Sequence, residues 1–206
     1  MGFGKKWAIT PARLLRREDL KALRSCAKSR LKGRRPRRSS RMLEQVVLEV
    51  ALGSGLRVAE IASLACGDLS LGKSSGSLLV RCGKGGKERT VIISGQLCRL
   101  LTRFLRWKKI AEQPTGSEFA LISTGRAGRF MSTRALQKMF SRLLAAAGVS
   151  HHRFHDLRHT YGSYLLRASG NDLVFVKDQM GHSDITTTAV YLHALNAEKA
   201  VNALYA

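Results

Sequence analysis

Acidic residues are scarce in this chain of 206 residues. Only 14 Asp and Glu stand against 36 Lys and Arg, which gives a formal net charge of +22 at pH 7. A protein with this much unbalanced positive charge is expected to bind a polyanion, and nucleic acid is the commonest polyanion. The charge alone would also suit an RNA-binding protein of the ribosomal kind, or a basic protein with another task.

The cysteine pattern and the lack of long apolar runs exclude further classes. The four cysteines, at positions 26, 66, 82 and 98, include no C-x-x-C pair. Neither a disulfide framework nor a zinc ribbon is therefore predicted, and a reducing compartment suits the chain. No apolar run approaches the length of a membrane span, and "MGFGKKWAIT" contains no signal-peptide core. We expect a cytoplasmic protein with no membrane partner.

The positive charge is concentrated at the start of the chain. Residues 1–41 hold fifteen Lys and Arg against two acids. Within them, residues 18–31 have helical spacing, and "KGRRPRRSSR" indicates an exposed connector because of its Pro36 and crowded charge. We predict a basic N-terminal arm with a helix and linker over 1–41, and the main domain over 42–206. A solvated linker with no binding role is the alternative for the arm.

Beyond residue 41 the pattern is mainly helical, with one short β region. Helical spacing covers 42–55, 56–66, 97–111 and 134–148, the last capped by Ser132 or Thr133 and ended by Gly148. Further helices are predicted over 156–169, 172–180, 184–193 and 196–205. Two strand-like runs, "SLLVRCG" and "ERTVIIS", are joined by the glycine-rich "GKGGK", which is typical of a hairpin. The predicted fold class is α+β, mainly α, with a small antiparallel sheet.

Two sequence patterns match motifs of cofactor sites but lack the neighbouring elements or ligands that such sites require. Residues 67–74 match the P-loop expression G-x-x-x-x-G-K-S, but they follow a helical run and lead into a strand, so no nucleotide site is predicted. His155 and His159 have metal-ligand spacing, but no further ligand pattern completes the set and Arg158 stands between them. We therefore expect neither a nucleotide nor a metal.

The stretch "RFHDLRHTYGSYLL" places His155 and Arg158 on one face near the start of a helix. The helix N-terminus favours an anion there. The planar fork of arginine suits two phosphate oxygens, and histidine moves a proton near neutral pH. This pair indicates a phosphate clamp with an acid–base group, with a charged surface helix as the plain alternative.

Three other segments carry similar chemistry. "GSGLRVAEIASL" places Arg57 after a glycine turn, with Glu60 one turn later to hold its guanidinium. "CGKGGKER" places Lys84 at a hairpin tip where glycines permit close approach. "MGHSDITTTAVYLH" places His182 after a glycine and Tyr191 nine residues later. Each segment alone is more simply structural, but together they form a set.

The ordered set G-L-R-x-x-E, G-K-G-x-K, H-x-L-R-H, G-H-S and a late Tyr resembles the tyrosine recombinase, or phage integrase, family. The resemblance runs from about Leu43 to Leu195 and implies the tyrosine-recombinase catalytic-domain fold. By position it implies two phosphate-binding arginines, a supporting acid, a hairpin lysine, two histidines and a nucleophile: Arg57, Arg158, Glu60, Lys84, His155, His182 and Tyr191.

The chemistry that the resemblance implies is the breakage and rejoining of DNA without ATP or metal. Tyr191 would attack the scissile phosphate, leaving a 3′-phosphotyrosine and a free 5′-hydroxyl. Lys84 would protonate the leaving 5′ oxygen, and His155 would act as acid or base near the phosphate. Arg57, Arg158 and His182 would stabilise the negative charge on the non-bridging phosphate oxygens.

The implied partners are double-stranded DNA and further copies of the chain, in a tetrameric synapse. Basic residues expected to contact DNA are Arg34, Arg35, Arg37, Arg38 and Lys87. Two alternatives remain: DNA relaxation of the type-IB topoisomerase kind, and DNA binding without catalysis.

Family members usually carry a separate helical core-binding domain before the catalytic one, whereas only about forty residues precede the motifs here. The chain therefore resembles the compact recombinases of the fimbrial phase-switch type, or the catalytic fragment of a longer integrase. A bacterial, phage or mobile-element origin is expected.

Overall fold

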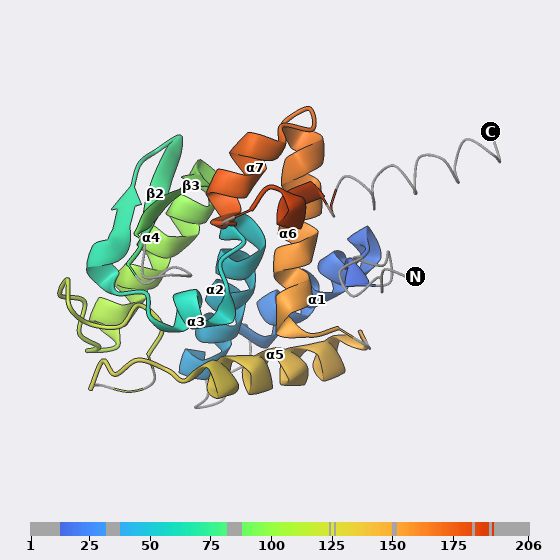
Figure 1. Ribbon diagram of the computed structural model, residues 1–206. Helices are drawn as coiled ribbons and strands as arrows, with labels where there is room; N and C mark the ends of the chain where they lie inside the picture. Colours follow the sequence, from blue (N-terminus) through green and yellow to red (C-terminus); the bar gives the residue numbers. More distant parts are fainter. Residues whose placement is uncertain are drawn as a thin grey trace.

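The computed structural model describes residues 13–31, 38–81, 88–123, 125, 127–149, 152–182, 184–189 and 191. Its elements are α1 (Arg17–Leu31), α2 (Arg38–Ser54), α3 (Val58–Ala62), η2 (Cys66–Asp68), β1 (Leu69–Leu71), β2 (Ser75–Val80), β3 (Arg89–Ser94), α4 (Gly95–Ile110), α5 (Thr133–Ala147), α6 (Phe154–Ala168) and α7 (Leu173–Met180). Figure 1 shows α2 in the middle of the molecule, with α6 on one side, the sheet and α4 on the other, and α7 above it. The predicted α+β, mainly helical class is confirmed.

The sheet is antiparallel, in the order β1-β2-β3. Leu78 of β2 lies opposite Val91 of β3. Alternation along β3 buries Val91 and Ile93 and leaves Ile92 57% exposed, as expected for a sheet with one face on the core. The pairing of the two predicted strands is confirmed, and β1 is an additional edge strand. The hairpin tip with Lys84 and Lys87 lies outside the described residues.

One hydrophobic core joins α1 to the helices that follow it. Leu20, Leu23 and Ala27 of α1 are buried in the same cluster as Val46 of α2 and Leu136 of α5. Their spacing of three and four residues makes one apolar stripe on a helix whose other face is charged. The division of the chain at residue 41 stays a prediction, but α1 packs on the same core as the helices beyond it.

Helix ends follow the capping residues in the sequence. At α5 the Ser132 hydroxyl accepts the backbone N–H of Ala135, and Gly148 ends the helix in the left-handed conformation with φ of 67°. The helix predicted over 56–66 was too long, because α3 ends at Ala62. Beyond it Ala65 forms an isolated β-bridge with Ala120 before η2 begins, and the carbonyl of Leu64 accepts the N–H of Leu121 at 2.8 Å.

The P-loop-like segment 67–74 runs from η2 through β1 into the turn before β2. It therefore lacks the strand–loop–helix order that cradles a phosphate chain. None of the described helices is long and apolar enough to span a membrane.

A buried lysine fastens the loop after α4. The Lys108 side chain is fully buried, and its Nζ donates to the carbonyls of Ala120 at 2.6 Å and Leu121 at 3.2 Å and to the Ser123 hydroxyl at 3.3 Å. The Cys66 Sγ lies 3.9 Å from the same nitrogen. Burial lowers the pKa of this ammonium group, while the nearby Cys66 raises it in part.

Candidate active site

Arg57 sits where the chain turns from α2 into α3. Gly55 has φ of +63°, and a Cβ there would collide with the ring of Tyr161, so the turn requires glycine. Arg57 is the N-cap of α3, with its backbone N–H on Glu60 Oε2 at 2.7 Å and its Nη1 on Glu60 Oε1 at 2.9 Å. The acid therefore fixes both the backbone and the guanidinium of Arg57.

Arg89, at the start of β3, holds the other side of the same carboxylate. Its Nη1 and Nη2 donate to the two oxygens of Glu60 at 2.9 and 3.0 Å, in a bidentate pair. Burial raises the pKa of Glu60, but the hydrogen bonds from Arg89 and Arg57 outweigh it and bring the pKa below its usual value. Glu60 is therefore ionised at neutral pH.

The C-terminal end of α7 brings two arginines from distant parts of the chain together. Arg57 Nη2 donates to the carbonyl of Gly181 at 3.3 Å, and Arg158 Nη2 donates to the preceding carbonyl, that of Met180, at 2.6 Å. Helix C-termini attract cations because unpaired carbonyls and the helix dipole point outward there. Arg158 Nη1 also donates to the carbonyl of Gly55 at 2.5 Å, which ties α6 to the turn before Arg57.

Arg158 is a buried charge, with 3% of its surface exposed. Burial, followed by repulsion from Arg57, lowers its pKa to about 10, so it remains a cation at neutral pH. Among the described residues, Glu60 is the one carboxylate that contacts any of Arg57, Arg89 and Arg158. Three guanidinium groups around one carboxylate leave an excess of positive charge, which favours an anion such as a phosphodiester.

The start of α6 supplies two histidines. His155 is exposed, and its ring meets that of His159 edge-on with 4.5 Å between centroids. Partial loss of water and the cation of Arg158 lower the pKa of His155. Burial, followed by His155, lowers the pKa of His159 to about 4. Both rings are therefore neutral near pH 7 when no anion is bound.

His182 follows α7 and lies against Tyr191. Its ring is nearly parallel to the phenol, with an interplanar angle of 4° and 6.2 Å between centroids. Its Nδ1 is 2.9 Å from Thr188 Oγ1. If the threonine hydroxyl donates to Nδ1, Nε2 carries the proton and can donate to an anion. Burial, followed by Arg158 and Arg57, lowers the pKa of His182 to about 3.

Tyr191 is 2% exposed and packs with Leu166, Val176 and Met180 in a small cluster of its own. Gly162 of α6 permits this position, because a Cβ there would lie 2.7 Å from the Tyr191 Cζ. Burial raises the pKa of Tyr191 to about 12, against the opposing effect of Arg158 and Arg57. The hydroxyl is therefore protonated and requires a proton acceptor before it can act as a nucleophile.

The structure brings together most of the residues singled out in the sequence. Hydrogen bonds or ring contacts connect Arg57, Glu60, Arg158, His182 and Tyr191 through the end of α7 and the start of α3. His155 joins them through His159. Lys84, Lys87, Arg34, Arg35 and Arg37 lie outside the described residues, and Arg38 begins α2 without a described side chain.

Sequence reasoning missed three residues of the site: Arg89, His159 and Thr188. Arg89 begins β3, and nothing in its local sequence indicated its contact with Glu60, 29 positions earlier. His159 ends the H-x-L-R-H motif, but the only role weighed for it in the sequence was that of a metal ligand. Among the described residues, no group of three or more His, Cys, Asp or Glu side chains is arranged to hold a metal ion.

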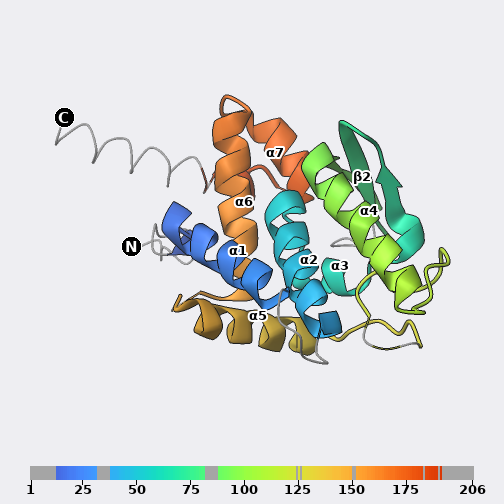
Figure 2. The ribbon, with the colours of Figure 1, turned by 180° about the vertical axis from the view of Figure 1, so that it is seen from behind.

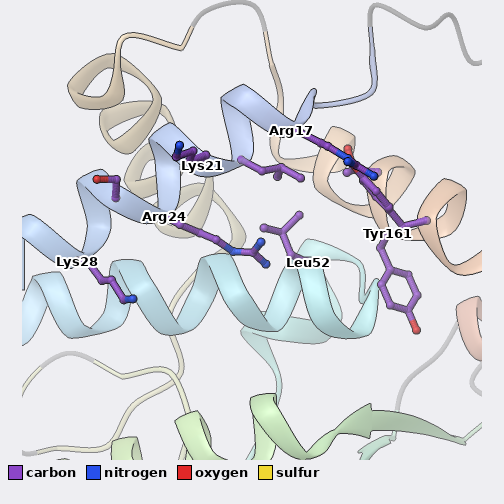
Figure 3. Close-up of a pocket in the computed structure, with 10 residues that line it drawn as sticks. Arg17, Lys21, Arg24, Lys28, Leu52 and Tyr161 are labelled. Carbon is purple, nitrogen blue, oxygen red and sulfur yellow. The ribbon is translucent and has the colours of Figure 1, made fainter. Parts of the chain in front are cut away.

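A separate basic groove lies between α1, α2 and α6. It has a volume of about 650 Å³, and Figure 3 shows Arg17, Lys21, Arg24 and Lys28 of α1 along it. Arg24 is already paired with Glu49 through two hydrogen bonds of 2.9 Å. None of the site residues described above lines this groove. In Figure 2, α1 lies in front of α6. In Figure 1, which views the molecule from the opposite side, the segment after α7 crosses in front of α2.

Comparison of the sequence with family models gives a match over most of its length. Residues 13–198 match the model described as the phage integrase family. The tyrosine recombinase XerC of Pseudomonas entomophila strain L48 is 36% identical over 150 residues, which is 73% of this chain and 48% of that protein. The XerC of Yersinia pestis is 35% identical over 151 residues, 73% of this chain and 47% of that protein. The chain spans about half the length of the curated relatives it matches.

Solved structures share the fold. The XerH site-specific recombinase bound to a palindromic difH substrate, in a post-cleavage complex, has a TM-score of 0.74 at 22% identity, covering 94% of this chain and 53% of that one. A lambda integrase tetramer bound to a Holliday junction has a TM-score of 0.63 at 19% identity, covering 86% and 47%. These similarities confirm the predicted catalytic-domain fold.

Proposed function

The chain belongs to the phage integrase family, and we propose that it is a site-specific DNA recombinase that cleaves and rejoins DNA through Tyr191. The observation that carries this proposal is the meeting of two arginines at the end of α7, beside a histidine stacked on a tyrosine. A phosphodiester anion suits the unbalanced charge of that site. A tyrosine hydroxyl is the nucleophile that lies next to it.

In the proposed reaction, Tyr191 Oη attacks the scissile phosphorus and the bond from phosphorus to the 5′ oxygen breaks. The forks of Arg57 and Arg158 and the Nε2–H of His182 donate to the non-bridging oxygens, where negative charge develops. Glu60 and Arg89 keep Arg57 in position. The product is a 3′-phosphotyrosine with a free 5′-hydroxyl, and attack by a 5′-hydroxyl from a second duplex completes the exchange.

The leaving 5′ oxygen requires a proton, and we assign this to Lys84, which lies between β2 and β3 in the sequence. The family motif G-K-G-x-K supports the assignment. His155 lies at the exposed edge of the site, where it would contact the phosphate as an acid or base. A DNA substrate with a 5′-bridging sulfur tests Lys84, because a thiolate leaves without a proton. Lys84→Ala should slow its cleavage far less than that of normal DNA.

The proposed partners are double-stranded DNA and three further copies of the chain, assembled on paired sites in a cytoplasmic setting. The solved lambda integrase tetramer on a Holliday junction supports such an assembly for this family. Arg34, Arg35, Arg37, Arg38 and Lys87 are proposed to contact DNA phosphates.

Covalent trapping tests the proposed function. The protein is incubated with a library of duplexes nicked at varied positions, so that cleavage next to the nick releases a short strand and preserves the adduct. We expect wild-type protein to retain DNA through denaturing electrophoresis, and Tyr191→Phe to bind DNA normally without an adduct. Adduct of wild-type yield in Tyr191→Phe would remove Tyr191 from the mechanism.

The recovered site then distinguishes recombination from relaxation. Placed twice in a supercoiled plasmid, it should give deletion or inversion products. A product that is only relaxed would favour the type-IB topoisomerase alternative. DNA binding without any adduct would favour a protein that binds DNA without catalysis.

A further inference from the structure

The nucleophilic tyrosine must lose a proton, and its surroundings make this difficult. Tyr191 is almost fully buried, and burial raises the pKa of its hydroxyl to about 12. At neutral pH very little of it ionises spontaneously. A group in contact with the hydroxyl must therefore take the proton as the bond to phosphorus forms.

The hydroxyl of Tyr191 contacts a histidine that carries no role so far. His159 Nδ1 lies 3.3 Å from the Tyr191 oxygen, with 6.0 Å between the ring centroids. Among the described residues, this is the one polar atom within hydrogen-bond distance of that oxygen. His182 is close as well, but its ring is stacked on the phenol and its Nδ1 faces Thr188.

The surrounding structure positions both partners of the His159–Tyr191 contact. His159 lies one helical turn after His155 on α6, and the edge contact between their rings fixes its orientation. Gly162, three residues further on, leaves room for the tyrosine ring against the same helix. The contact thus joins residues 32 positions apart along the chain.

His159 is in the protonation state that a base requires. Burial lowers its pKa to about 4, so its ring is neutral at pH 7. The titratable and charged groups that face it are Tyr191, His155, His182, Asp156, Arg13 and Arg158. Of these, only Asp156 favours a proton on His159 in the free protein. A phosphate in the site would add negative charge and make the imidazole a better acceptor during the reaction.

We propose that His159 is the general base that accepts the phenolic proton of Tyr191 during cleavage and returns it during religation. As Tyr191 Oη bonds to phosphorus, its proton passes to His159 Nδ1, and the bond to the 5′ oxygen breaks as that oxygen is protonated by a separate acid. Religation reverses each transfer. The proposal rests on the proposed function and assigns one residue within it.

Single-turnover cleavage and religation of the trapped DNA site measure this role. The variants are His159→Gln, which keeps a polar side chain that cannot take a proton, and His159→Phe, which keeps the ring. His152→Gln is the matched control, since His152 lies in the same segment but faces Asp19 and Asp156 at 3.9 and 3.8 Å. Thermal unfolding and DNA binding are measured for each variant to establish that it folds.

We expect both His159 variants to cleave and to religate about 10²-fold to 10³-fold more slowly, the range for loss of a general base. DNA binding and the equilibrium between cleaved and intact DNA should stay within about twofold, because a base acts equally on both directions. The control should cleave at the wild-type rate.

Chemical rescue separates proton transfer from positioning. A fluorinated tyrosine at position 191 ionises nearer neutral pH and depends less on a base. In that background, His159→Gln should lose less than about tenfold. A loss without rescue would overturn the proposal and indicate a structural contact, and wild-type or faster cleavage by His159→Gln would overturn it as well. If wild-type protein itself forms no adduct, the proposed function fails instead.

Discussion

Lys108 and Arg158 are both buried cations that hydrogen-bond to backbone carbonyls instead of a carboxylate. Lys108 has three N–H donors and three oxygen acceptors, so its hydrogen-bonding capacity is filled. Arg158 has five donors, and two contacts to protein acceptors are recorded in the described part of the chain. The first cation closes a loop, and the second retains capacity for a ligand.

The comparison shows that burial of a charge does not by itself identify a functional site. Burial lowers the pKa of both groups. What differs is the surroundings, since Lys108 has a thiol and carbonyls beside it, whereas Arg158 faces Arg57, His182 and Tyr191. Within the described part of the chain, an excess of positive charge and guanidinium donors beyond the two that contact carbonyls distinguish the second site, which lies next to a nucleophile.

Arg158→Lys should have the largest effect. A lysine supplies a point charge but cannot hold two carbonyls and two phosphate oxygens at once. We expect cleavage to fall by about 10²-fold to 10³-fold, the loss found when a transition-state donor is removed. The measurement is single-turnover adduct formation at saturating protein. Cleavage within tenfold of wild type would mean that the fork of Arg158 does not act on the phosphate.

The comparison extends to the basic residues of the arm. Changing Arg34, Arg35, Arg37 and Arg38 to Ser should flatten the slope of log K against log salt by about 3 to 4 units if all four contact phosphates. Adduct formation on bound DNA should persist, because none of the proposed catalytic residues is in the arm.

A variant with the same loss of charge controls for nonspecific electrostatics. Arg99, Arg103, Arg106 and Lys109 are exposed on α4, which lies toward the viewer in Figure 2. Changing these four to Ser should alter the slope by less than about one unit. Equal slopes for the arm variant and the wild type would mean that the arm does not contact DNA.

Lys108→Met should affect stability and not chemistry. Loss of the ammonium leaves buried carbonyls without a donor, which costs about 1–3 kcal/mol of unfolding free energy. Lys109→Met is the control, because the neighbouring lysine is exposed and should be replaceable without cost. Chemical denaturation gives the free energies, and adduct formation well below the melting temperature should match wild type. A selective loss of cleavage in Lys108→Met would contradict the structural role.

The smallest expected effect is on the pH dependence of stability. The pKa values of His182, about 3, and His159, about 4, are below that of an unfolded histidine near 6.5. The unfolded state therefore binds more protons as pH falls below about 6.5, and the unfolding free energy falls with it. Arg158 contributes to both shifts, although burial is the larger cause.

Arg158→Met should raise the pKa values of both histidines. The unfolding free energy should then depend less steeply on pH, because fewer protons are taken up on unfolding; the change should be less than one proton, or less than about 1.4 kcal/mol per pH unit. Lys108→Met should keep the wild-type slope. Denaturation at a series of pH values from 7 to 4 measures both. If the unfolding free energies of the two variants depend equally on pH, the charge of Arg158 does not affect the pKa values of His159 and His182.

The fold class and the main site residues were accessible from sequence because each depends on local signals. Helical spacing, the Ser132 cap and the hairpin glycines are each visible within a few consecutive residues, and the motifs around Arg57 and Arg158 are equally short. β1 was missed because the alternation of Leu69-Ser70-Leu71 covers only three residues, which is too short to indicate a strand. Arg89 and His159 depend on contacts across 29 and 32 residues, which no local pattern reports. Lys108, within "RWKKIA", looks like a solvated lysine until the loop after α4 covers it.

The central claim is that Tyr191 forms the covalent bond to DNA, and locating the adduct tests it most directly. The chain has four tyrosines, at 161, 164, 191 and 205, and trypsin places them in three peptides, 159–167, 178–199 and 200–206. The trapped adduct is digested with trypsin and nuclease and analysed by mass spectrometry. The account predicts a nucleotide remnant on peptide 178–199, at Tyr191. A remnant on either of the other peptides, with 178–199 unmodified, would contradict it.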